Sequence, residues 1–113
     1  MMLLLWAAVA LAQTITLSGR VEWSGAGPVR IEALSEDSEG QILVVSSVTL
    51  DGPGRFELAV PAGTGPLRLR AGSDPERDGI GPWAAMGIYP GLVRVGAQDI
   101  GKLDWTLSMP RVQ

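Results

Sequence analysis

The sequence predicts a single all-β domain, a seven-stranded antiparallel Greek-key β-sandwich. Three observations predict this fold. Apolar residues recur at every second position in several segments, Gly and Pro are concentrated between those segments, and no segment has the apolar period of a helix. The chain of 113 residues contains 15 Gly and 8 Pro, enough to mark a turn after each expected strand. Short strands separated by frequent turns are typical of two packed sheets.

The clearest strand is expected over residues 14–23. Ile15, Leu17, Val21 and Trp23 fall on one face, and polar side chains fall on the other. This alternation indicates a strand with one face on the core and one in water. Further strands are expected at residues 29–34, 42–50, 55–60, 67–71, 92–95 and 103–109.

The expected core faces follow from the same alternation. The inward set is Val29, Ile31, Ala33, Phe56, Leu58, Val60, Leu67, Leu69, Leu103, Trp105 and Leu107. The charged residues between them, such as Glu32 and Arg70, are expected on the outward faces of their strands. Residues 42–50 alternate less regularly, and Ser46-Ser47 marks a bulge or a change of strand there.

The N-terminal segment Met1 to Ala12 predicts export. It is uncharged, too short to span a bilayer, and ends in the small-x-small step Ala10-Leu11-Ala12. Residues 1–12 are therefore expected to be a signal peptide, although no Lys or Arg precedes the apolar run. The alternatives are a buried apolar strand or a retained anchor. Residues 13–113 then form one secreted or periplasmic domain with no membrane span.

Composition excludes several classes of function. The chain has no Cys and no His, so disulfides, transition-metal sites built from these residues and His-dependent nucleophilic catalysis are excluded. A net charge of −3 gives no basic field for nucleic acid. No acid lies in an obviously apolar segment, so we expect no catalytic residue and no cofactor.

One long irregular segment is expected at residues 73–91, which are rich in Gly and Pro. Loops of this length are usually functional or disordered. Its start, Asp74-Pro75-Glu76-Arg77-Asp78-Gly79, places carboxylates at alternate positions before a Gly, as in a calcium loop. Asp74, Glu76 and Asp78 are therefore candidate calcium ligands. Arg77 and the missing acid at position 85 favour a plain acidic turn instead.

The same segment carries aromatic residues. Trp83 and Tyr89 are candidate contact residues, because Trp and Tyr are favoured at binding surfaces. The simpler interpretation is that Trp83 closes an open end of the sandwich. If it is such a plug, replacing it destabilises the fold; if it is a contact residue, replacement weakens capture of a partner.

Four places in the chain form a recognisable order: Ile15 to Val21, Gly52 to Leu58, the turn Val60-Pro61-Ala62-Gly63 and a closing strand pair at residues 93–107. In these segments and their order the chain resembles the carboxypeptidase regulatory-like, or transthyretin-like, β-sandwich family. The resemblance implies a non-catalytic exported module that binds an unidentified protein, or has a structural role, in the cell envelope. The histidines on which the family's hydrolases depend are absent here. The alternatives are a calcium-stabilised adhesion module, a carbohydrate-binding module or a carboxylate-based hydrolase.

Overall fold

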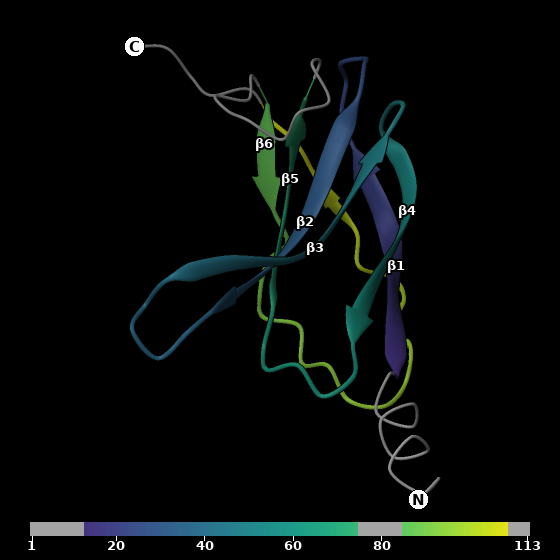
Figure 1. Cartoon of the computed structure of the whole chain (residues 1–113). Helices are drawn as coiled ribbons and strands as arrows, with labels where there is room; N and C mark the ends of the chain where they lie inside the picture. The colour runs from purple at the N-terminus through teal and green to yellow at the C-terminus, as the bar shows by residue number, and fades with distance from the viewer. Residues whose placement is uncertain (1–12, 75–84, 109–113) are drawn as a thin grey trace, which may run out of the picture.

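The computed structural model describes residues 13–74 and 85–108, which contain seven strands and no helix (Figure 1). In chain order these are β1 (Thr14–Glu22), β2 (Val29–Glu36), β3 (Ile42–Leu50), β4 (Gly54–Pro61), β5 (Arg68–Ser73), β6 (Met86–Ile88) and β7 (Trp105–Thr106). The predicted all-β class is confirmed.

The strands form two sheets around one apolar core. Sheet A has the order β4-β1-β7, and sheet B has the order β3-β2-β5-β6. The core contains Ile15, Leu17, Val21, Val29, Ile31, Ala33, Phe56, Leu58, Val60, Leu67, Leu69, Ala71, Ala85, Val93, Val95, Leu103, Trp105 and Leu107. Both sheets contribute to it, and burying a large aliphatic side chain stabilises a fold by roughly 1.5–3 kcal/mol.

The register of β1 and β4 explains the two-residue period. Ile15 lies opposite Val60 and Leu17 lies opposite Leu58, so inward residues pair with inward residues across the ladder. Each of these four side chains is almost completely buried. The alternation in the sequence therefore identified the core face correctly for both strands.

One pairing differs from the predicted antiparallel arrangement, because β7 runs parallel to β1. The chain before β7 also follows β1, but as an irregular segment. Two carboxylates complete the ladder there: the backbone N–H of Thr16 donates to Asp99 Oδ1 and that of Arg20 donates to Asp104 Oδ1, both at 2.9 Å. Gly19 permits this approach, since a Cβ at that position would lie 2.0 Å from the carbonyl oxygen of Leu103.

The sixth strand was predicted at the wrong place. Residues 92–95 form only an isolated bridge, in which Val93 exchanges two backbone hydrogen bonds with Leu67. The strand is instead Met86–Ile88, inside the segment expected to be irregular, and it pairs with β5. Its middle residue is Gly87, where a Cβ would lie 2.3 Å from the carbonyl oxygen of Thr106. Close packing requires a glycine at position 87. Because glycine has no side chain, the two-residue alternation typical of a strand cannot be seen in this segment.

The C-terminal strand was predicted at residues 103–109, but within the described residues 103–108 only Trp105–Thr106 form it. It is organised around Trp105. The Trp105 ring packs edge-to-face against Phe56 and Tyr89, with centroids 5.5 and 5.8 Å away. Its Nε1–H donates to the carbonyl oxygen of Gly87 at 3.0 Å, so the buried indole has its polar group satisfied. Trp23, expected in the core, is half-buried at its edge.

Candidate functional site

A β-hairpin projects from the body of the domain at one edge of sheet B (Figure 1). We call residues 34–44 of this hairpin the arm. It begins at a shift in register between Ala33 and Leu34, where Ser46 and Val44 are their partners and Val45 is left unpaired. This irregularity lies next to the Ser46-Ser47 pair at which a bulge was an expected alternative. Bulges bend a strand locally, which accounts for the departure of the arm from the sheet.

The tip of the arm is fixed by hydrogen bonds. The Asp37 carboxylate oxygen Oδ1 accepts from the backbone N–H of Glu39 and of Gln41, at 2.8 and 2.9 Å. The backbone N–H of Asp37 donates to the carbonyl oxygen of Gln41, and Gly40 takes a φ of 83°, which glycine tolerates. The tip is therefore a defined turn, so the strands behind it are held in register.

The arm exposes three consecutive aliphatic side chains. Ile42, Leu43 and Val44 have 59%, 51% and 50% of their surface accessible. Val44 and Ile42 lie opposite Leu34 and Glu36, on the outer face of the sheet, while Leu43 lies on the other face. Both faces of the arm are therefore apolar at its base.

The edge of β3 is open. Within the described part of the chain, β3 pairs only with β2. Its nine residues, ILVVSSVTL, contain no charge, no Pro and no Gly. Edge strands usually carry charges or Pro because these block pairing with another strand, and β3 has neither; its protection is limited to the bulge at Val45.

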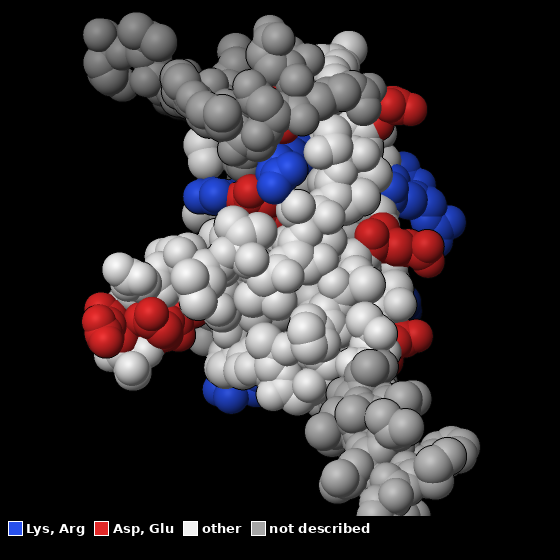
Figure 2. Space-filling view, viewed as in Figure 1, with Lys and Arg blue, Asp and Glu red and all other residues white. Residues whose placement is uncertain are grey.

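The arm has an acidic tip and a hollow beside its base. Glu36, Asp37 and Glu39 are exposed at the tip, where Figure 2 shows acidic side chains standing apart from the other charges of this face. Between the arm and the body lies a hollow of about 300 Å³. Its walls are Leu34, Ser35, Glu36, Ile42, Pro66, Arg68 and Leu92. The arm thus combines an apolar base with a negative tip.

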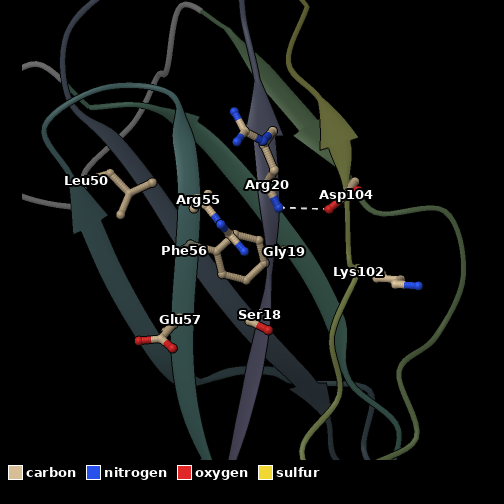
Figure 3. Close-up of a pocket in the computed structure, with 9 residues that line it drawn as sticks. All are labelled: Ser18, Gly19, Arg20, Leu50, Arg55, Phe56, Glu57, Lys102 and Asp104. Carbon is tan, nitrogen blue, oxygen red and sulfur yellow. Dashed lines mark hydrogen bonds between the residues drawn. The ribbon is translucent and has the colours of Figure 1, made fainter.

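A second hollow, a groove of about 590 Å³, lies on the outside of sheet A (Figure 3). It is lined by Ser18, Gly19, Arg20, Leu50, Arg55, Phe56, Glu57, Lys102 and Asp104. Lys102 is the one non-glycine residue among those described that has a positive φ, 61°. Lys102 belongs to the irregular segment that runs beside β1. Two residues further on, Asp104 accepts the backbone N–H of Arg20 from β1.

Glu32 lies on the outer face of sheet B, as expected, but it is buried there. It has 3% of its surface exposed and lies between two arginines. Arg30 Nε is 2.9 Å from Oε2, and Arg70 donates from Nε to Oε1 at 3.1 Å and also from Nη2. Burial alone would raise the pKa of Glu32. The hydrogen bonds and positive charges of Arg30 and Arg70 outweigh it and hold that pKa below its ordinary value of 4.5.

Of the residues predicted from the sequence as sites, Asp74 and Tyr89 lie within the described part of the chain. Asp74 is buried, with 1% exposed, and its backbone N–H donates to the carbonyl oxygen of Pro28 at 2.9 Å. Glu76, Asp78 and Trp83 lie outside the described residues. Tyr89 is half-buried against Trp105, so its ring is part of the packing at the edge of the core.

Residues 13–74 and 85–108 contain no group of three acids placed to hold a metal ion. They also contain no helix long and apolar enough to cross a membrane.

Sequence reasoning missed both the arm and the groove. Three consecutive aliphatic residues normally indicate a buried segment, so the exposure of the arm was not expected. The groove depends on the pairing of Arg20 with Arg55, which is visible only once the register of β1 and β4 is known.

Comparison of the chain with protein-family models, with curated proteins and with solved structures found no match.

Proposed function

We propose that this chain is an exported, non-catalytic binding module that pairs an extended segment of a partner protein with the open edge of β3. One observation carries the proposal: the uncharged strand β3 presents Ile42, Leu43 and Val44 half-exposed at an edge with no strand beside it among the described residues. An added strand gains main-chain hydrogen bonds from such an edge, and alternate side chains provide specificity.

The chemistry of the arm defines the occupant. Pairing with β3 places alternate side chains of the added strand beside Ile42 and Val44 on the outer face, which favours aliphatic residues there. The acids Glu36, Asp37 and Glu39 lie just beyond. A Lys or Arg at the end of the added segment would meet them, so we expect an aliphatic, extended segment with a basic end.

Preorganisation favours this role. The register of the arm and the hydrogen bonds of Asp37 are in place before any partner arrives. Binding therefore does not have to order the receiving strand, and this lowers the entropic cost of association.

A synthetic peptide tests the strand-pairing proposal. The probe is a fluorescent peptide of alternating Val and Thr with two Lys at one end, made in both orientations and with blocked termini. Anisotropy should show saturable binding to residues 13–113. Val44→Lys should weaken it about tenfold or more, because a lysine on an edge strand opposes pairing.

The matched control is Ala59→Lys, an exposed residue on β4, the edge strand of the other sheet. The affinity of this variant for the peptide should stay within about twofold of the wild type, because Ala59 lies opposite Thr16 in sheet A and is not part of the β3 edge. A peptide with Glu in place of Lys should bind more weakly. Equal loss in both variants, or no binding of either peptide orientation, would contradict the proposal.

The exported character and the finer topology belong to the same proposal. The uncharged run Met1 to Ala12 supports export. The passage of the chain between sheets from β1 to β2 and from β3 to β4 supports a Greek-key, transthyretin-like arrangement. N-terminal sequencing of protein from the envelope or medium should begin at or near Gln13. Recovery of intact Met1 on cytosolic protein would contradict export.

A further inference from the structure

The groove on sheet A holds two arginines directly across from each other. The β1–β4 register pairs Arg20 with Arg55, and the next outward pair is Ser18 with Glu57. Directly opposed residues of an antiparallel ladder have Cβ atoms only about 4.5–5.5 Å apart, and like charges at such positions destabilise the sheet. A negative group bound between the two arginines would relieve this repulsion.

The protein's own acids do not provide that balance. Among the described residues, neither Arg20 nor Arg55 forms an ion pair with an acid, while Arg30 and Arg70 both do. Asp104 already uses Oδ1 to accept the backbone N–H of Arg20. Figure 3 shows both guanidinium groups over the strip between β4 and β1, with the Glu57 side chain pointing to the far side of β4.

The charge of the groove is opposite to that of the whole chain. Its lining includes three cations, Arg20, Arg55 and Lys102, against the two acids Glu57 and Asp104. The chain as a whole carries −3. An anion is therefore drawn to this groove rather than to the surface around it.

We propose that the groove binds an oxyanion, a carboxylate or phosphate group, held between the guanidinium groups of Arg20 and Arg55. Guanidinium presents planar pairs of N–H donors that match two oxygens of such a group. A bound oxyanion would turn the repulsion between the two arginines into attraction to a shared partner. The inference does not depend on the strand-pairing proposal, because β3 contributes only Leu50 to the lining.

The test uses inorganic phosphate and glutarate as separate probes, with NaCl of equal ionic strength as the reference. Two-dimensional ¹⁵N NMR of residues 13–113 follows the side-chain Nε–H signals of the arginines. Those of Arg20 and Arg55 should shift together and saturate. Saturation with phosphate alone would assign a phosphate group, and saturation with glutarate alone would assign a carboxylate, such as one from a protein segment.

Variants separate a site from general attraction. Arg20→Gln and Arg55→Gln should each weaken binding about tenfold, because each removes one of the two charge-assisted donors. Arg94→Gln removes an exposed arginine outside the groove and should leave the affinity unchanged. Equal weakening in all three variants, or shifts that NaCl reproduces, would overturn the proposal. Val44→Lys should have no effect on it, so a failure of strand binding is distinguishable.

Discussion

Removing the carboxylate of Glu32 should destabilise the fold in a pH-dependent way. Glu32 has 3% of its surface exposed, and its two oxygens accept hydrogen bonds from Arg30 and Arg70. Breaking a fully buried ion pair by removing one partner costs roughly 3–5 kcal/mol. Here the side chains of Arg30 and Arg70 are 22% and 33% exposed, so they can turn to water. We therefore expect Glu32→Gln to lower the free energy of unfolding by about 2 kcal/mol at pH 7.

The sign of the pH dependence follows from the lowered pKa of Glu32. In the unfolded chain the carboxyl titrates near 4.5, and in the folded chain it titrates below that value. Its stabilising contribution is therefore fully present above 4.5, and it is lost as the pH falls through the folded pKa. The difference between wild type and Glu32→Gln should be largest at neutral pH and should shrink below pH 4.5.

Urea unfolding of residues 13–113, followed by Trp fluorescence between pH 3 and 7, measures this difference. Glu57→Gln is the matched control, because Glu57 is exposed and forms no ion pair among the described residues. Its effect should stay within about 0.5 kcal/mol at every pH. A gap for Glu32→Gln that is equally large at pH 3 and pH 7, or that is absent at pH 7, would refute the reasoning.

Three further changes have defined outcomes. Gly19→Ala should cost about 1–3 kcal/mol in urea unfolding, because its methyl group would lie 2.0 Å from the Leu103 carbonyl oxygen, whereas Gly65→Ala meets nothing within 4 Å and should be near neutral. Trp105→Ala should cost about 3–5 kcal/mol by the same measurement, since it removes the ring between Phe56 and Tyr89 and the hydrogen bond to Gly87. Millimolar calcium should leave the thermal midpoint unchanged, and a rise would revive the predicted calcium loop, since a native-state ligand must raise it.

The sequence predicted those strands whose two faces differ. β1 and β4 alternate because one face packs on the core and the other meets water, so their inward residues follow from the pattern. β6 escaped prediction because Gly87 replaces the side chain that would show the period. The length of β7 was not predicted correctly, because in the segment before β7 the side chain of Asp104, and not a backbone carbonyl, accepts the N–H of Arg20.

The candidate sites depend on partners distant in the chain, which local pattern does not contain. Whether Ile42 is buried depends on whether another strand lies beside β3, and an apolar residue looks the same in either case. Glu32 is buried because Arg70, 38 residues later, closes over it. Arg20 faces Arg55 only because a specific register was selected. In each case the sequence shows the type of the residue, but it does not show which residues surround it in the fold.

The seam between β1 and the segment leading to β7 has a consequence for folding kinetics. The backbone of Thr16 finds its acceptor 83 residues later, and that of Arg20 finds its acceptor 84 residues later. Contacts this distant form late, because a long loop must close first, and such topologies fold in about milliseconds to seconds. Until Asp99 and Asp104 arrive, β1 has its own free edge. The nascent domain therefore has two unprotected strands, and its folding yield should fall with protein concentration as these edges pair between molecules.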